Sequence, residues 1–305
     1  MRIATYRELQ LKDELFPLFQ HAFWWPFNPK EFEKTIKADP RLRNSPVGYA
    51  AIKSNHLVGF VGVMEIMTRT TEGSEETVGG VWGVVTHPAH ARKGIFTALM
   101  QKSHEYFKEQ GYKFSLLNTS KSLIAYTFYQ KLGYRDVTVY PSAYKVVKQT
   151  KKTTRKSGKK NTKLDWSGIL DMFNQVTEDR SGFVVRSTQY GKMLETRKII
   201  QPKKCIVTGK GYALLNEDRG NVSVQEMIAL TKGEVSKLIT HSESKATKTV
   251  IAEAVLDDTL RRAYLSHGFM ILEDSYGLLM FKPLTNASFM EVYGNKFYAA
   301  ASDYF

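Results

Sequence analysis

The stretch Val81–Met100 constrains the fold most. An apolar run typical of a β-strand ends at a proline, a short basic turn ends at Gly94, and a helical pattern begins at Ile95. This order predicts a strand, a loop and a helix. A helix start leaves backbone N–H groups unpaired and carries the positive end of the helix dipole, so the turn could hold a phosphate group. An ordinary strand-to-helix turn with two solvated basic residues, Arg92 and Lys93, would give the same pattern.

Apolar periodicity around this stretch predicts a mixed α/β arrangement. Residues 8–23 carry apolar side chains at helical spacing, and Pro17 within them implies a kink or two shorter helices. The other elements expected in this half are a hairpin of strands over 47–52 and 57–68, a strand from 77 into the loop, a helix over 95–110, a strand over 114–118 and a helix over 122–132.

A second block that begins at Leu164 repeats this order of elements. After an amphipathic start, we expect strands over 205–208, 211–216 and 222–230, a helix over 234–239, a strand over 250–254, a helix over 257–265 and a hairpin over 270–281. No basic glycine turn follows Leu230, in contrast to the first block. Between the blocks, the segment from Lys145 to Lys163 is rich in lysine and contains no acidic residue, which is typical of a solvated linker.

Length and composition limit the class of protein. A chain of 305 residues exceeds one typical domain, so we expect two, each able to bury a core. No apolar run approaches the roughly 18 to 20 residues of a membrane span, and the first residues do not resemble a signal peptide, so we expect a cytoplasmic protein without a membrane partner. The single cysteine, Cys205, excludes an internal disulfide. Much of the net charge of +14 lies in the linker, which weakens the case for nucleic acid.

The loop after the third strand resembles the acetyl-coenzyme A binding motif of the GNAT acetyltransferases, a strand followed by V-x-P and (Q/R)-x-x-G-x-(G/A). Thr86-His87-Pro88 stands at the strand end, Arg92-Lys93-Gly94 matches the loop, and Ile95 is the first apolar helix position. Ala91 replaces the usual Arg or Gln, which removes one phosphate contact but leaves the backbone donors. Phe96 replaces a usual small residue, and a bulky side chain at this position is similar to the Eis subgroup.

A second motif of the same family, A-x-x-(F/L)-Y-x-x-x-G-(F/Y), is matched downstream by Ala125, Phe128, Tyr129, Gly133 and Tyr134. The resemblance implies that Tyr129 protonates the departing thiolate of coenzyme A. A phenol suits this role because it is a weak acid that can first donate a hydrogen bond to the sulfur. The alternative is that Tyr129 is one more half-buried aromatic residue in a tyrosine-rich chain.

The resemblance also implies an architecture of two tandem GNAT folds, each a mixed twisted sheet flanked by helices, so that the fold class is α/β (α+β). We expect a catalytic domain over 1–148, a basic linker over 149–163, a degenerate GNAT-like domain over 164–285 and a C-terminal tail over 286–305. The second domain resembles the degenerate domain of Eis proteins, and we infer that it holds no coenzyme A and walls the acceptor site. Where Eis proteins carry a sterol-carrier-like third domain, we expect only the short tail over 286–305.

The residues of a catalytic site follow from the same resemblance. The expected cofactor-binding residues are Val84, Val85, Thr86, Arg92, Lys93, Gly94, Ile95 and Phe96. In the family, the first helix and the loop after it lie beside the acceptor pocket. Candidates to line that pocket are therefore Phe23, Trp24, Trp25 and Phe27. From the residues alone, the favoured alternative is that these aromatic side chains beside a proline pack into the core at the end of a helix.

An amine must lose a proton before it attacks a thioester, so a general base is expected. Many GNAT enzymes supply a carboxylate from the strand before the loop, but residues 78–86 contain none. The candidates are Glu65 on the preceding strand, a water chain, or the terminal carboxylate of Phe305, the group that the Eis resemblance implies. A frayed chain end would leave Phe305 without a role.

We therefore predict an N-acetyltransferase that uses acetyl-coenzyme A (acetyl-CoA) as co-substrate and transfers its acetyl group by direct attack of a primary amine. No metal is expected, because the histidines lack ligand spacing, and His87, His90 and His104 are expected at the surface. The acceptor is a small-molecule or peptide amine, nucleic acid is not an expected partner, and a homo-oligomer is expected. The alternative is a non-catalytic module that binds coenzyme A or associates with nucleic acid.

Overall fold

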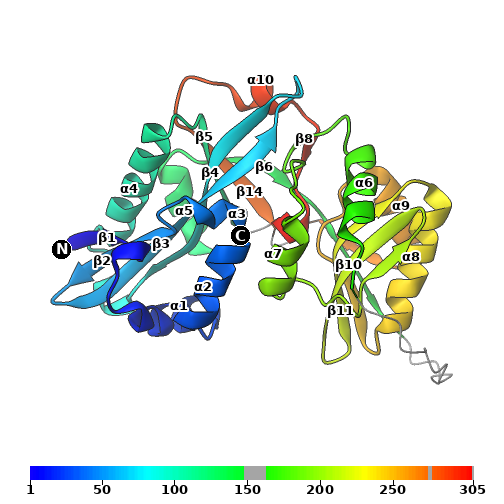
Figure 1. Cartoon of the computed structure of the whole chain (residues 1–305), viewed down its shortest axis with the longest axis horizontal. Helices are drawn as coiled ribbons and strands as arrows, with labels where there is room; N and C mark the ends of the chain where they lie inside the picture. The colour runs from blue at the N-terminus through cyan, green and yellow to red at the C-terminus, as the bar shows by residue number, and fades with distance from the viewer. Residues whose placement is uncertain (148–162, 274–276, 304–305) are drawn as a thin grey trace. The chain divides into compact units, whose positions relative to one another are not determined.

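The computed structural model describes residues 1–147, 163–273 and 277–303 (Figure 1). These residues form two compact units. The first consists of Met1–Val137 and Leu279–Asn295, and the second of Thr138–Leu278 with the described residues from Lys296 onward. Each unit has its own mixed sheet with helices against it, which confirms the predicted α/β fold class.

The sheet of the first unit has the strand order β1-β2-β3-β4-β5-β14-β6. Its strands are β1 (Arg2–Thr5), β2 (Gly48–Lys53), β3 (His56–Arg69), β4 (Glu75–Thr86), β5 (Phe114–Thr119), β6 (Arg135–Val139) and β14 (Leu278–Pro283). Neighbours from β1 to β4 pair antiparallel, whereas β4 and β5 run parallel. The predicted hairpin and the strand that enters the loop are therefore confirmed.

Short and long helices connect these strands (Figure 1). They are η1 (Tyr6–Glu8), η2 (Lys12–Glu14), α1 (Leu15–Phe23), α2 (Pro29–Ala38), α3 (Pro40–Arg43), η3 (Pro88–His90), α4 (Ile95–Glu109), α5 (Ile124–Lys131) and α10 (Phe289–Tyr293). The predicted helix over 8–23 is thus divided, as Pro17 implied. Pro17 lies in the first turn of α1, where the missing N–H breaks no helical hydrogen bond.

Different elements pack against the two faces of this sheet. On one face α4 lies so close that a Cβ on Gly79 would stand 2.4 Å from the ring of Phe107. On the other face six rings from α1, the loop after it, α2, β3 and β4 pack together, with neighbouring ring centroids 4.9 to 6.3 Å apart. This aromatic cluster consists of Phe19, Trp25, Phe27, Phe32, Phe60 and Trp82.

The sheet of the second unit has the strand order β13-β7-β12-β11-β10-β9. Its strands are β7 (Ser142–Val146), β9 (Ile206–Thr208), β10 (Gly211–Asp218), β11 (Asn221–Ala229), β12 (Thr249–Ala252) and β13 (Met270–Leu272). Its helices are α6 (Trp166–Val176), α7 (Tyr190–Thr196), α8 (Lys232–Lys245) and α9 (Asp258–Ser266). The short strands β8 (Ser181–Gly182) and β15 (Phe297–Tyr298) pair in parallel, and η4 (Ala301–Asp303) follows β15 in the chain.

Each sheet is completed by a strand from the other half of the chain. In the first unit β14 lies between β5 and β6, and in the second unit β7 lies between β12 and β13. The predicted hairpin over 270–281 is therefore wrong, because β13 and β14 belong to different sheets. The units also differ from the predicted ranges 1–148 and 164–285 at these two strands.

Both sheets contain the same local irregularity, which we call the fork. In the first unit, β4 and β5 pair from Gly79↔Ser115 to Val81↔Leu117, and just beyond that point β4 contains one extra residue relative to β3. In the second unit, β11 and β12 pair up to Val224↔Ala252, and β11 then contains an extra residue relative to β10. A bulge bends and twists its strand, so parallel partners separate there. The repeated fork supports the predicted repeat of one fold.

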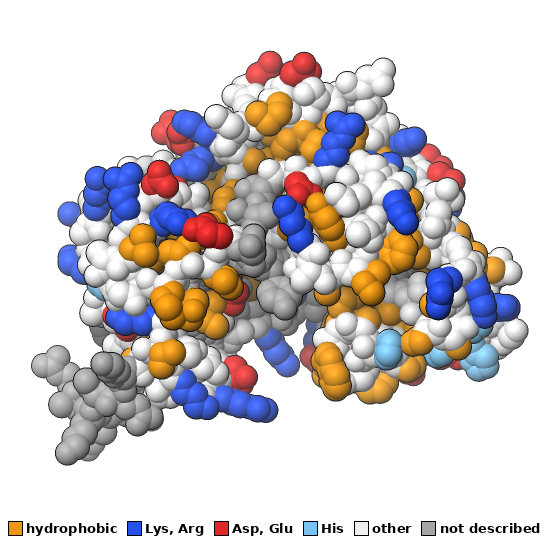
Figure 2. Space-filling view, turned by 180° about the vertical axis from the view of Figure 1, so that it is seen from behind, with side chains coloured by type: hydrophobic (Ala, Val, Ile, Leu, Met, Phe, Trp, Pro, Cys, Tyr) orange, Lys and Arg blue, Asp and Glu red, His pale blue; other side chains and the backbone are white. Residues whose placement is uncertain are grey.

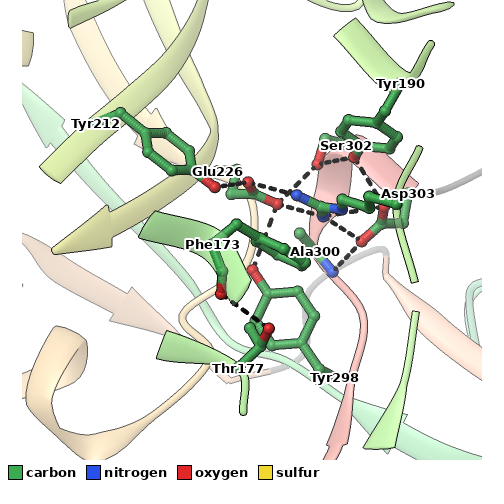
Figure 3. Close-up of polar contacts among 10 residues, drawn as sticks. Phe173, Thr177, Tyr190, Tyr212, Glu226, Tyr298, Ala300, Ser302 and Asp303 are labelled. Carbon is green, nitrogen blue, oxygen red and sulfur yellow. Dashed lines mark hydrogen bonds and ion pairs between the residues drawn. The ribbon is translucent and has the colours of Figure 1, made fainter. Parts of the chain in front are cut away.

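A buried network of charges joins the last described residues to the core of the second unit (Figure 3). The Arg186 guanidinium donates to the carboxylate of Glu226 at 2.5 Å and to that of Asp303 at 2.9 Å. The hydroxyl of Tyr190 donates to Asp303 at 2.8 Å, and that of Tyr212 donates to Glu226 at 2.5 Å. Burial disfavours the charged form of Glu226, but Arg186 and the hydroxyl donors hold its pKa below the ordinary value, whereas burial raises the pKa of Asp303.

Candidate functional site

The fork of the first unit leaves the end of β4 with one unpaired edge. Among the described residues, β4 beyond Val81 pairs with β3 alone, although β5 flanks its earlier part. The bulge lies around Gly83, whose φ of +57° favours glycine. Val84, Val85 and Thr86, three of the predicted cofactor-binding residues, follow directly. Their backbone can form β-type hydrogen bonds with an extended chain that carries amide groups.

The loop after β4 presents backbone donors at the start of α4. Arg92 and Gly94 both adopt left-handed conformations, with φ of +59° and +75°, and Gly94 occupies the helix N-cap. Within the described chain, the N–H groups of Lys93, Gly94, Ile95 and Phe96 have no backbone acceptor. The side chains of Arg92 and Lys93 are exposed, whereas Ile95 is buried against the sheet. Unpaired donors, the helix dipole and two cationic side chains suit a phosphate group.

Tyr129 lies on α5 close to this helix start. Its ring centroid is 5.9 Å from that of Phe96 in the first turn of α4 and 5.9 Å from that of Tyr134. Its hydroxyl makes no hydrogen bond within the described residues. Burial raises the pKa of Tyr129 above its ordinary value, so the phenol stays protonated at neutral pH. A neutral, unpartnered phenol can act as a proton donor.

A buried polar chain supports Tyr134, the neighbour of Tyr129. The Tyr134 hydroxyl lies 2.6 Å from Ser115 Oγ on β5 and 3.0 Å from His104 Nε2 on α4. The expectation that His104 lies at the surface is wrong, because the helical spacing of α4 turns it toward the sheet, and burial lowers its pKa to about 3. His104 is therefore neutral at physiological pH.

The aromatic residues expected at the acceptor pocket separate into two pairs. Phe23 and Trp24 point to solvent, with 47% and 84% of their surface exposed, because α1 ends there in a left-handed residue. Trp25 and Phe27 instead belong to the aromatic cluster, with ring centroids 4.9 and 5.2 Å from that of Phe19. The positions of Trp25 and Phe27 thus fit the interpretation that they pack in the core, and they fit equally well the interpretation that they line a pocket.

Glu65, the candidate base, lies on the α4 face of the sheet, away from the aromatic cluster. It pairs with Gly79, whose missing side chain leaves room for Phe107, and its carboxylate accepts a hydrogen bond from Tyr106 of α4 at 2.6 Å. Phe305 and most of the predicted linker over 149–163 lie outside the described residues.

Two polar side chains at the fork were not singled out from the sequence. The side-chain N and O atoms of Asn118 on β5 and Nε1 of Trp82 on β4 are shielded from solvent and have no partner among the described residues. Asn118 directly follows Leu117, the last β5 residue that pairs with β4. The sequence signal that could have identified Asn118 is a polar residue near the end of a buried strand.

The fork of the second unit lacks the corresponding anion site. Two residues separate the end of β11 from the start of α8, and the Thr231 side chain accepts a hydrogen bond from the Glu234 N–H at 3.3 Å. A capping hydroxyl and the Glu234 carboxylate thus occupy the helix start. A cavity of about 70 Å³ lies at this fork, lined by β11 residues that include Met227 and Ile228, and it has room for only a few water molecules.

Within the described part of the chain, no three His, Cys, Asp or Glu side chains group closely enough to hold a metal ion. None of the described helices is both long and apolar enough to cross a membrane.

Comparison with solved structures identifies the fold. A GCN5-related N-acetyltransferase from Kribbella flavida matches with a TM-score of 0.63 at 17% identity, covering 93% of this chain and 72% of that chain. One from Anabaena variabilis ATCC 29413 matches with a TM-score of 0.63 at 14% identity, covering 93% and 73%. Eis1 from Mycobacterium abscessus matches with a TM-score of 0.51 at 15% identity, covering 85% and 72%. The chain therefore has the GNAT fold.

The sequence match to this family is confined to the first unit. Residues 5–137 match the family described as "Acetyltransferase (GNAT) domain". No curated protein matches the chain in sequence. The match includes the fork, the loop and Tyr129, so the predicted GNAT resemblance of this part is confirmed. The Eis subgroup stays a prediction, since the TM-score to Eis1 is lower than those to the other two structures.

Proposed function

We propose that the first unit is an acetyl-CoA-dependent N-acetyltransferase in which a primary amine attacks the thioester directly. The observation that carries this proposal is that three chemical parts lie at one end of the sheet: an unpaired strand edge, a helix start with free donors, and a protonated phenol. Tyr129 packs against Phe96 of that helix start. The match of residues 5–137 to the GNAT acetyltransferase family supports the same conclusion.

Each part has a role in this proposal. The backbone of Val84, Val85 and Thr86 binds the pantetheine arm and polarises the thioester carbonyl. The donors from Arg92 to Phe96 hold the pyrophosphate. The capped start of α8 in the second unit offers no equivalent, so we propose that only the first unit binds coenzyme A.

The chemical step forms one bond and breaks one. The neutral amine nitrogen attacks the carbonyl carbon, the C–S bond breaks, and the thiolate takes a proton from Tyr129, while the amine proton passes to a base. We propose that this base is not on β4, which has no carboxylate after Glu76. The role predicted for Phe305 stays a prediction. The position of Glu65 on the α4 face favours a part in fixing Tyr106.

The substitution Tyr129→Phe tests the proposal. We expect kcat for thiol release from acetyl-CoA with an amine panel to fall about 100-fold or more, at nearly constant acetyl-CoA affinity, because only the proton donor is lost. Tyr126→Phe on the same helix is the matched control, since its hydroxyl donates to Asp136 at 3.2 Å and should leave kcat unchanged. An unaltered kcat for Tyr129→Phe would contradict the assignment of Tyr129 as the general acid.

The rival class, a module without catalysis, gives a different outcome in the same assay. Coenzyme A binding with no thiol release for any amine would favour it. Nucleic-acid binding requires basic side chains gathered in one patch. On the face in Figure 2, lysine and arginine side chains lie interspersed with acidic and hydrophobic ones, which favours the enzyme.

We also propose a homo-oligomer of the full chain. Exposed apolar side chains on α9 and β13, among them Leu265, Met270 and Leu272, support an interface with another copy. Analytical ultracentrifugation tests this point, and a monomer at micromolar concentration would contradict it.

A further inference from the structure

The side-chain amide of Asn118 is buried and has no hydrogen-bond partner among the described residues. Neither its side-chain oxygen nor its nitrogen is accessible to solvent, and neither has a hydrogen-bond partner among the described residues. Buried polar groups are almost always paired, because losing their hydrogen bonds to water without replacement destabilises the fold. An unpaired amide at a candidate site is therefore one that a ligand can satisfy.

The register of the sheet places Asn118 on the face away from α4. Gly79 and Ser115 are paired neighbours, and both face α4: the first packs against Phe107 and the second contacts Tyr134, which contacts His104 of that helix. Side chains alternate along a strand, so Asn118, three residues after Ser115, lies on the opposite face. Tyr129 packs against Phe96 and Tyr134 on the α4 side.

This arrangement separates the two ends of the proposed reaction. The proton donor lies on the α4 side of the fork, where the departing thiolate must be, and the unpaired amide lies at the fork on the other face. The unpaired amide and the proton donor therefore lie on opposite faces of the sheet at the same fork. Trp82 Nε1 is also unpaired, but its indole lies over Gly62 on β3, on the side of β4 remote from β5.

We propose that Asn118 binds the amine acceptor and selects primary amines that carry a hydroxyl group on the neighbouring carbon. This inference rests on the proposed function and names the substrate class of that site. The amide oxygen accepts a hydrogen bond from the amine, and the amide N–H donates to the hydroxyl oxygen, so both unpaired groups are satisfied together. A plain alkylamine leaves the N–H unpaired, and a site built for a hydrogen bond discriminates against a substrate that cannot form it.

The test compares ethanolamine with propylamine, in which a methyl group replaces the hydroxyl. For the full chain, at equal concentrations of neutral amine, we expect kcat/KM to favour ethanolamine about tenfold, as expected for one hydrogen bond. Asn118→Leu should abolish this preference by lowering kcat/KM more for ethanolamine, which loses two hydrogen bonds, than for propylamine, which loses one, with little change in acetyl-CoA affinity. Asn118→Asp, which keeps the acceptor but loses the donor, should lose the preference as well.

A purely structural role for Asn118 predicts a different result for thermal stability. Replacing an unpaired buried amide by an apolar side chain of similar size should leave the melting temperature unchanged or raise it, whereas loss of a structural hydrogen bond would lower it. A lower melting temperature for Asn118→Leu, or an ethanolamine preference that survives in it, overturns the proposal.

Direct binding separates this inference from the proposed function. Ligand-detected NMR measures ethanolamine binding to the full chain in the presence of coenzyme A. Binding that Asn118→Leu abolishes supports the acceptor site even if no acetyl transfer occurs, and the enzymatic function then fails alone. Turnover of both amines at equal rates overturns the selectivity and leaves the acetyltransferase intact.

Discussion

Replacement of Arg186 by methionine is expected to cost the protein a large part of its stability. The side chains of Arg186 and Glu226 are 3% and 0% exposed, and that of Asp303 is 6% exposed, so Arg186→Met leaves two carboxylates in the interior without their counter-charge. Uptake of a proton at pH 7 by one carboxyl group with a pKa near 4 requires about 4 kcal/mol. This cost falls mainly on Glu226, because burial already raises the pKa of Asp303 in the native protein and Asp303 therefore adds little to the loss.

We therefore expect Arg186→Met to lower the free energy of unfolding by about 4 kcal/mol, within the range measured when one partner of a buried ion pair is removed. Domains of this kind have only about 5–15 kcal/mol in total. In the variant, both carboxyl groups have pKa values above those of the unfolded chain, so protonation relieves the loss. The destabilisation should therefore be smaller at pH 5 than at pH 7.5.

Urea unfolding followed by circular dichroism measures both effects. Arg262→Met is the matched control, because Arg262 is 81% exposed and 4.0 Å from Asp258, and its loss should change stability by less than about 1 kcal/mol. The triple variant Arg186→Met, Glu226→Gln, Asp303→Asn removes all three charges and should recover most of the loss. A loss below about 1 kcal/mol in Arg186→Met, or one independent of pH, would refute the reasoning.

Two further predictions concern the first unit. Because the folded state holds His104 neutral with a pKa of about 3, the unfolded chain binds an extra proton below pH 6.5, so stability should fall with decreasing pH by up to about 1.4 kcal/mol per pH unit. His104→Gln should lack this part of the slope in urea unfolding between pH 7 and 5, and equal slopes would contradict the assignment. A fragment of residues 1–147 lacks β14 and should show no cooperative thermal transition, whereas residues 1–137 fused through a flexible linker to 279–295 should regain one; cooperative melting of the short fragment would show that β14 is dispensable.

Local sequence was sufficient to predict the parts of the site that lie close together in the chain. The strand end, the loop through Gly94 and the start of α4 follow one another, and Tyr129 lies in a helix with its own motif. Apolar periodicity and turn residues act over a few positions, so they identify such elements directly. The repeated order of the second half was visible for the same reason.

Features that join distant segments could not be predicted in this way. The exchange of β7 and β14 depends on which strands pair, and the hairpin expected over 270–281 was the simplest choice from neighbouring residues alone. Arg186, Glu226 and Asp303 are far apart in the chain and share no motif. Asn118 gave too little signal, because an asparagine after a strand is ordinary until the structure leaves its amide buried and unpaired.

The exchanged strands determine when the site can form during synthesis. A ribosome releases the chain from its N-terminus, and domains generally fold as they emerge. The first unit cannot complete its sheet in this way, because all strands of the second sheet lie in the chain between β6 and β14. The nascent chain must therefore hold β5 and β6 apart, with an open gap between them, until residue 283 has emerged. A sheet that lacks an inner strand exposes the unpaired edges of β5 and β6. This protein should therefore depend on chaperones more than a chain in which each of two domains is continuous in sequence.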